Sequence, residues 1–213
     1  MKKIFAVITL LISLASAAEA QYYRRGGQQF LLGANAAYSV TTRDFGKIAK
    51  NGTGANLSAR YLINEVIGLG FETGYHNFKS KIGSNTQIAQ ETKYRLIPLL
   101  LEATFYIPTW DRSLLPYLGV HFGGYMALIS VSKQDSGYEG ESVKKKLNSF
   151  SPGGGPHAGL LIELNEFVKL DLRLRGDYVA TIEADYSDEY QTYNTGFDKI
   201  LNFGGSVGLL YTF

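Results

Sequence analysis

The sequence predicts an all-β fold: an eight-stranded antiparallel up-and-down transmembrane β-barrel. Three observations predict it. Apolar residues recur at every second position in eight segments, the connections between these segments are alternately long and short, and no segment after the N-terminal twenty residues resembles a membrane-spanning helix. Because outer-membrane barrels have short turns at one end and longer loops at the other, the alternation of connection lengths favours a barrel over a soluble sandwich.

The clearest strand signal lies in 168–178, which reads VKLDLRLRGDY. Successive side chains of a strand point to opposite faces, so this segment has one apolar face built on leucines and one charged face. In a membrane barrel the apolar face contacts lipid and the charged face lines the lumen. The charged residues of this face are Lys169, Asp171, Arg173, Arg175 and Asp177.

Seven other segments alternate in the same way and are expected to be strands. They cover residues 30–40, 55–61, 67–76, 96–107, 117–126, 158–164 and 201–213. The long polar connections cover residues 41–54, 79–93, 130–150 and 182–199. The short connections lie at 64–65, 108–116 and 165–166. An even number of strands leaves both termini at the end with the short turns, which is the periplasmic end.

Aromatic residues near the expected strand ends fit the girdles that barrels place at the two membrane interfaces. Tyr61, Trp110 and Phe213 are expected at the periplasmic interface, and Tyr38 and Tyr75 at the outer interface.

The first twenty residues predict export. A basic start is followed by a short apolar run and by Ala18-Glu19-Ala20, a small-x-small cleavage pattern. We therefore expect a signal peptide over residues 1–20 and one barrel domain over 21–213. The chain has no cysteine, and removal of the leader changes the net charge from +2 to about +1, which gives no reason to expect a nucleic-acid partner.

Two stretches carry a resemblance to known proteins. The final strand, with Leu209, Tyr211 and Phe213 at alternate positions, resembles the terminal signal that outer-membrane barrels present to their assembly machinery. The expected domain is similar to small OmpA/OmpX-type outer-membrane barrels. The segment Ile97-Pro98-Leu99-Leu100-Leu101 also resembles PorT-like barrels of Bacteroidota. The resemblance implies a location in the outer membrane of a Gram-negative cell, and no single activity.

An eight-stranded barrel is only wide enough for its inward side chains to fill it. The inward charges are nearly balanced, and buried charges need partners. Glu163 is expected beside Arg173 or Lys169 on the neighbouring strand. The predicted lumen network comprises Arg60, Glu72, Glu102, Glu163, Lys169, Asp171, Arg173, Arg175 and Asp177. A polar plug is the main interpretation, and a gated small channel is the alternative.

Nothing in the sequence indicates an enzyme, a metal or a cofactor. His121 is expected inside the lumen, whereas His76 and His157 are expected near the outer rim, with Ser80 and Ser151 nearby in the chain. No His-x-Ser pair shares a strand face, and neither a metal-ligand cluster nor a phosphate-binding loop occurs.

Two long loops carry contact candidates. Lys144, Lys145 and Lys146 are expected in the third loop, where they would meet lipopolysaccharide phosphates. The fourth loop combines acidic residues with Tyr186, Tyr190 and Tyr193, a composition typical of binding loops that is also compatible with a divalent cation. Solvated loops without a ligand are the alternative for both.

The sequence therefore predicts a monomeric outer-membrane barrel with a structural or surface-interaction role. Its expected partners are outer-membrane lipids, lipopolysaccharide and, during biogenesis, the barrel assembly machinery; an extracellular or secretion-system partner remains open. The alternatives are a conduit for small solutes or hydrophobic ligands, an accessory of a secretion or assembly system, and a lipid-modifying enzyme.

Overall fold

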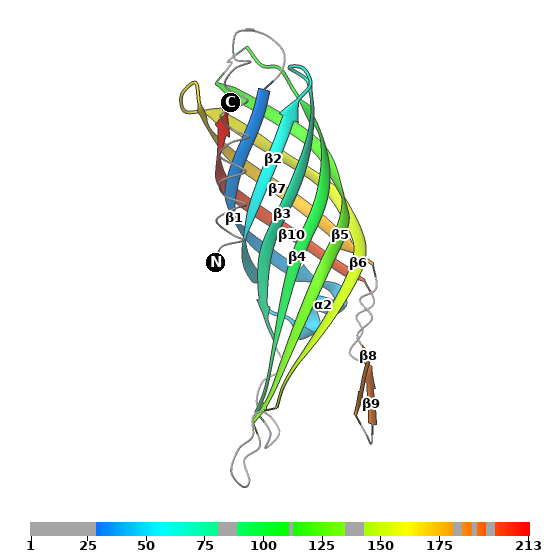
Figure 1. The fold of residues 1–213 in the computed structure, drawn as a ribbon. Coiled ribbons are helices and arrows are strands. Elements are labelled where there is room, and N and C mark those ends of the chain that lie inside the picture. The colour runs from blue at the N-terminus through cyan, green and yellow to red at the C-terminus, as the bar shows by residue number, and fades with distance from the viewer. Residues whose placement is uncertain are drawn as a thin grey trace, which may run out of the picture.

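The computed structural model describes residues 29–80, 89–110, 113–134, 143–180, 185–188, 191–194 and 199–213. Nearly all of them are in β-strands (Figure 1). The elements are β1 (Gln29–Thr42), α2 (Arg43–Ile48), β2 (Gly52–Leu62), β3 (Ile67–Lys79), β4 (Ala89–Tyr106), β5 (Leu114–Gln134), β6 (Val143–Glu163), β7 (Val168–Val179), β8 (Asp185–Asp188), β9 (Gln191–Asn194) and β10 (Ile200–Thr212).

Eight of the strands form a closed antiparallel barrel, in the order β1-β10-β7-β6-β5-β4-β3-β2. Each strand pairs with its neighbour in the chain, and β10 closes the barrel against β1 from Leu31↔Thr212 to Thr42↔Leu201. Strands β8 and β9 pair only with each other in the fourth connection. Closure leaves no unpaired strand edge for hydrocarbon to contact. The predicted up-and-down eight-stranded barrel is confirmed.

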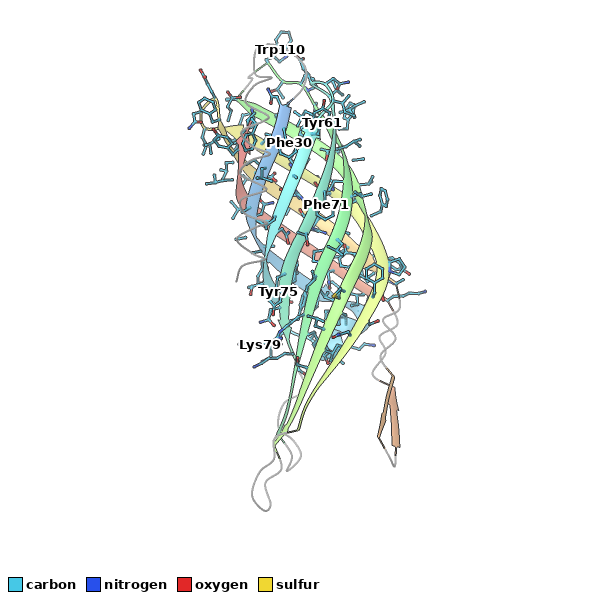
Figure 2. All side chains as sticks on the ribbon, in the orientation of Figure 1. Phe30, Tyr61, Phe71, Tyr75, Lys79 and Trp110 are labelled. Atoms are coloured by element: carbon cyan, nitrogen blue, oxygen red, sulfur yellow. The ribbon has the colours of Figure 1, made fainter. Side chains whose placement is uncertain are left out.

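The two faces of the barrel divide as the alternation predicts. The outward side chains are apolar and exposed, and include Leu57, Leu69, Leu118 and Leu174. Figure 2 shows Phe30, Tyr61 and Trp110 at the end with the short turns and Tyr75 toward the opposite end. An exposed apolar surface of this extent requires a lipid environment.

Strands β4, β5 and β6 are longer than the sequence analysis predicts, because each strand continues beyond the point where its outward residues become polar. On β4 the outward positions change from Ile97 to Arg95 and Lys93, while Leu96 and Tyr94 on the inner face are buried. The outward apolar alternation thus ends at the membrane surface, but the strand continues with an apolar inner face, as in a soluble protein. Within the expected loops at 79–93 and 130–150, the described residues 89–93, 130–134 and 143–150 are therefore strand.

The first long connection, expected to be a polar loop over 41–54, contains helix α2. Arg43 adopts a left-handed backbone conformation with φ of 51°, which turns the chain out of β1 and into the helix. Ala49 then pairs with Ser80 through an isolated antiparallel bridge. Figure 1 shows α2 at the loop end of the barrel. The described residues include no helix long and apolar enough to cross a membrane.

Candidate functional site

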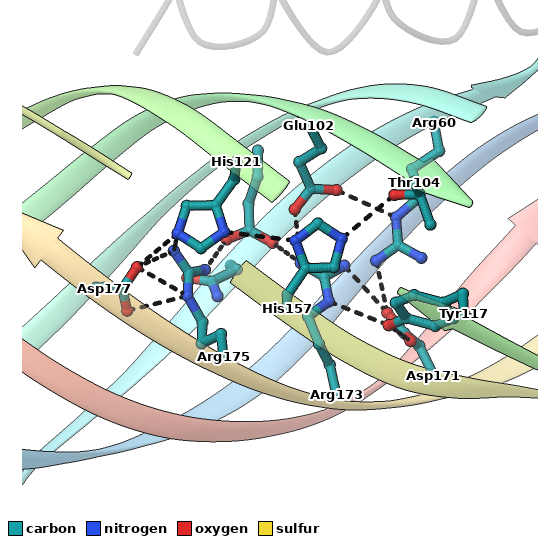
Figure 3. Close-up of polar contacts among 12 residues, drawn as sticks. Arg60, Glu102, Thr104, Tyr117, His121, His157, Asp171, Arg173, Arg175 and Asp177 are labelled. Carbon is teal, nitrogen blue, oxygen red and sulfur yellow. Dashed lines mark hydrogen bonds and ion pairs between the residues drawn. The ribbon is translucent and has the colours of Figure 1, made fainter. Parts of the chain in front are cut away.

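The lumen contains a buried network of charges that connects opposite walls of the barrel (Figure 3). The alternation of β7 places its charged residues on the inner face, and β2, β3 and β4 contribute the facing groups. Three buried arginines meet four buried carboxylates: Arg60, Arg173, Arg175, Glu72, Glu102, Asp171 and Asp177.

Arg173 is the centre of this network. Its Nη1 donates to Glu72 Oε2 on β3 at 2.5 Å and to Glu102 Oε1 on β4 at 2.7 Å. Its Nη2 donates to Asp171 Oδ2 at 3.2 Å, and its Nε donates to the Tyr117 hydroxyl at 3.2 Å. One guanidinium therefore connects β7 with β3, β4 and β5 through charge-assisted hydrogen bonds, which are the stronger kind.

Arg60 approaches the same carboxylates from β2. Its Nη2 donates to Asp171 Oδ2 at 2.8 Å, and its Nε lies 3.3 Å from Glu102 Oε2. The guanidinium also lies over the Tyr117 ring, 5.3 Å from its centroid, while the Tyr117 hydroxyl donates to Asp171 Oδ1 at 2.5 Å. Asp171 thus receives hydrogen bonds from two arginines and one tyrosine, so its burial is compensated.

Arg175 forms the second half of the network, on the loop side of Arg173. Its Nη2 donates to Asp177 Oδ1 at 2.6 Å, and its Nη1 forms an ion pair with Glu72. The Tyr125 hydroxyl also donates to Asp177 Oδ1, at 2.7 Å. Since Glu72 bonds to both Arg173 and Arg175, the two halves form one continuous network.

A chain of histidines joins this network to β4. His121 Nε2 lies 2.9 Å from Asp177 Oδ1, His121 Nδ1 lies 3.4 Å from His157 Nδ1, and His157 Nε2 lies 3.3 Å from Thr104 Oγ1. One assignment of protons satisfies these three contacts: Thr104 donates to His157, His157 to His121, and His121 to Asp177. The rings stack with centroids 5.7 Å apart.

The predicted position of His157 near the outer rim is wrong. His157 lies opposite Gly119 and Arg175 in the register and is buried among lumen side chains, because β6 begins many residues earlier than expected. His76 is buried as well, with its Nε2 2.8 Å from Asn56 Oδ1. In the described part of the chain, no cluster of three or more histidines and carboxylates has the arrangement of a metal site.

Two of the nine predicted network residues lie apart from the rest. Glu163 pairs with Lys169, its register partner at the end with the short turns, at 3.3 Å, and 40% of its side chain is exposed. The other predicted neighbour of Glu163, Arg173, instead lies opposite Gly159 in the register. Of the two predicted neighbours of Glu163, Lys169 is confirmed and Arg173 is wrong, because Arg173 reaches across the lumen rather than to the neighbouring strand.

An apolar cluster lies on the loop side of the network; we call it the loop-end seal. Phe45 of α2 is its centre and packs edge-on against Phe78 and Tyr94, with ring centroids 5.4 Å and 5.7 Å away. The remaining buried members come from four barrel strands and the end of α2: Ala49, Leu96, Leu100, Tyr125, Ala127, Ile129, Val179 and Ile200. The sequence analysis missed Phe45, although the apolar spacing of Phe45, Ile48 and Ala49 indicates one face of a helix.

A second apolar cluster, the terminus-end seal, lies on the opposite side of the network. Its buried residues are Leu31, Leu62, Tyr106, Tyr117, Leu161 and Leu210. The hydroxyl groups of Tyr117 and Tyr125 point from the two seals to Asp171 and Asp177 respectively. The buried side chains thus form three layers, with charges in the middle and apolar side chains on both sides.

The predicted loop contacts fall in strands. Lys144, Lys145 and Lys146 lie in the first part of β6, opposite Ser132, Val131 and Ser130 of β5. Tyr186 and Tyr193 face each other across the β8–β9 pair. Tyr190 and the side chains of this hairpin lie outside the described residues.

The predicted assembly residues lie on the last strand. Leu209 and Tyr211 are outward and exposed, and the Phe213 ring packs against Tyr211 and Phe30 with centroids 4.8 Å and 5.9 Å away. The backbone N–H of Phe213 also donates to Phe30 O at 2.9 Å. The terminal residue is therefore accessible at the seam between β1 and β10, while its role as a signal stays a prediction.

We expect deletion of Phe213 to lower the amount of folded protein in the outer membrane and to leave unfolded chain in the periplasm. Heat-modifiable migration on a gel measures the folded fraction in each compartment. The matched control is Phe30→Ala, which removes the same aromatic contact but keeps the terminal residue. Equal loss in both variants would attribute the effect to packing at the seam rather than to a terminal signal.

Comparison with known proteins follows the fold. A family model described as "Outer membrane protein beta-barrel domain" matches residues 6–210. Among curated protein sequences, none is significantly similar to this chain.

Solved structures with the same fold share little sequence with it. Neisserial surface protein A of Neisseria is 22% identical, covers 86% of this chain and 97% of its own, and superposes with a TM-score of 0.56. OprG from Pseudomonas aeruginosa is 14% identical, with coverage of 89% and 97% and a TM-score of 0.54. Ail of Yersinia pestis, solved with the heparin analogue sucrose octasulfate, is 17% identical, with coverage of 88% and 99% and a TM-score of 0.51.

Proposed function

Because the chain belongs to the outer membrane protein β-barrel domain family, we propose that it is a sealed, non-conducting barrel with a structural or surface-interaction role. The protein is thus an outer-membrane protein, and its long connections face the cell exterior. In the proposed role, the barrel anchors the outer ends of β3–β6 and the β8–β9 hairpin at the cell surface.

One observation carries the proposal: the layered filling of the lumen. Ions crossing the barrel would have to pass the loop-end seal, the network around Arg173 and the terminus-end seal. An aqueous pore is lined by solvated groups of one prevailing sign, whereas here charges of both signs are bonded to one another. The histidines and Thr104 are likewise bonded within the lumen and buried, which supports a role other than catalysis.

We expect the purified full chain to give no ion conductance when it is inserted into planar lipid bilayers. An open porin inserted into the same bilayers is the positive control, and heat-modifiable migration establishes that the inserted protein is folded. Reproducible conductance steps from the folded wild-type barrel would overturn the sealed lumen.

A conduit for small hydrophobic ligands is the second candidate, and a seam in the wall favours it. Strands β6 and β7 pair at Gly154↔Tyr178 and again at His157↔Arg175, but not between these positions, where Pro156 cannot donate a ladder hydrogen bond. A conduit requires this seam to open. A disulfide in the double variant Pro156→Cys/Gly176→Cys, placed across the seam, would stop ligand uptake by a conduit and leave a sealed barrel unchanged.

The partners follow from the location and are proposals. Outer-membrane lipids and lipopolysaccharide surround the barrel, and the barrel assembly machinery inserts it. A monomer fits the closed β1–β10 seam, since the eight barrel strands close on themselves without a second copy. An extracellular or secretion-system partner would dock on the loop end, and crosslinking in intact cells, followed by purification, would identify it.

A further inference from the structure

Basic residues gather on the outward face of the β3–β6 wall. Lys79 of β3 pairs with Lys93 of β4, Lys93 pairs with Ser130 of β5, and Ser130 pairs with Lys146 of β6. These pairings form one continuous cross-strand row. Arg95 lies two residues from Lys93 on the same face of β4. We call Lys79, Lys93 and Arg95 the basic strip, and Lys144 and Lys146 continue it by register along β6.

The basic strip begins where the lipid-facing surface ends. The preceding row is apolar on all four strands and consists of Tyr75, Ile97, Met126 and Phe150. In the next row, Arg95 pairs with Leu128 of β5, which is outward and apolar as well. Arg95 lies two positions beyond Ile97, roughly 7 Å along the strand. Lys79 lies four positions beyond Tyr75, roughly 13 Å along the strand. Figure 2 shows Lys79 next to Tyr75 and farther toward the loop end.

The depth of the basic strip in the membrane indicates which chemical group it can contact. The polar headgroup region adds roughly 5–7 Å to each side of the hydrocarbon, and strand tilt lowers the height of each residue above it. The Arg95 guanidinium is therefore at headgroup level, and long lysine side chains above it can bend toward the membrane while their stems stay on the wall. Arginine binds phosphate through paired hydrogen bonds, and lysine binds it as a point charge.

We propose that the basic strip binds the phosphate groups of lipopolysaccharide in the outer leaflet. Only the outer-membrane location and the orientation of the barrel enter this inference, so it stands whether or not the lumen conducts. The strip would hold one phosphorylated lipid against the preceding apolar row. The acyl chains would lie on the apolar wall, and the phosphates would contact Arg95, Lys93 and Lys79.

The test measures binding of fluorescent lipopolysaccharide to the full chain, folded in a nonionic detergent. The same lipopolysaccharide after enzymatic removal of its phosphates, and heparin as a soluble polyanion, are the comparison ligands. We expect the phosphorylated lipid to bind more tightly than the dephosphorylated lipid. Each cation removed should weaken binding roughly fivefold, so Lys79→Gln/Lys93→Gln/Arg95→Gln should weaken it on the order of 100-fold.

Lys199→Gln is the matched control, because Lys199 is exposed at the loop end but precedes β10 on another wall. Its affinity should equal that of the wild type. Equal binding of the two lipids by the wild type overturns the proposal, and this comparison holds even where the triple variant fails to fold. Tight binding of heparin without binding of the phosphorylated lipid would also overturn it, in favour of a glycan-binding surface.

Discussion

Replacing Arg173 with alanine should destabilise the folded barrel by about 3–5 kcal/mol. The substitution removes the hydrogen bonds that Glu72, Glu102 and Asp171 receive from one guanidinium, and all three carboxylates are buried. Arg60 and Arg175 retain their contacts with these groups. The network would then contain two arginines and four carboxylates, so the negative charges would no longer be balanced. Urea unfolding of the protein in lipid vesicles, followed by heat-modifiable migration, measures the change in free energy.

A double-mutant cycle separates an orphaned charge from a general loss of packing. Glu102→Gln combined with Arg173→Ala should cost less than the sum of the two single changes, by about 1 kcal/mol or more. Lys169→Ala is the matched control, since it breaks the part-exposed ion pair with Glu163 and should cost about 0–1 kcal/mol. If Arg173→Ala were no more costly than this control, the charges would be solvated and the lumen would be a water-filled channel.

The strand faces could be predicted because alternation is a local property of the chain. Each outward or inward assignment needs only the positions on either side, and the eight segments could be recognised one at a time. The buried, inward positions of Arg60, Glu72 and Glu102 follow from the same rule. The lipid-facing aromatics follow from it as well.

The outer ends of the strands could not be predicted from the apolar outward face. Beyond Ile97 and Met126, strands β4 and β5 leave the hydrocarbon, so apart from Leu128 their described outward residues become polar, while Leu96, Tyr94, Ala127 and Ile129 are buried on the inner face. A search for outward apolar residues therefore assigns the outer ends of these strands to loops. Helix α2 was missed for a related reason: Phe45 and Ile48 are the only large apolar residues in a short polar stretch, and the neighbours of Phe45 in the loop-end seal come from distant strands.

The partners across the lumen also depend on information that no single strand contains. Register pairs Glu163 with Lys169, but Arg173 bonds to residues of β3 and β4, on a different part of the wall. Which walls face one another is set by closure, strand tilt and stagger of the whole barrel. Alternation identifies the set of lumen charges, and only the assembled barrel decides how they pair.

Leu172→Arg should destabilise the barrel by about 2–4 kcal/mol, the cost of a cation on the lipid face near the bilayer midplane. Leu172 is outward near the centre of β7, and its register partners Leu160 and Val207 are apolar too. The guanidinium introduced at position 172 would therefore have only hydrocarbon around it. The matched control is Asn148→Arg, which adds the same side chain to the outward face of β6 beyond the apolar row and should cost about 0–1 kcal/mol. Unfolding in vesicles measures both. Equal free energies for the two variants would mean that lipid does not cover Leu172 and that the assigned membrane face is wrong.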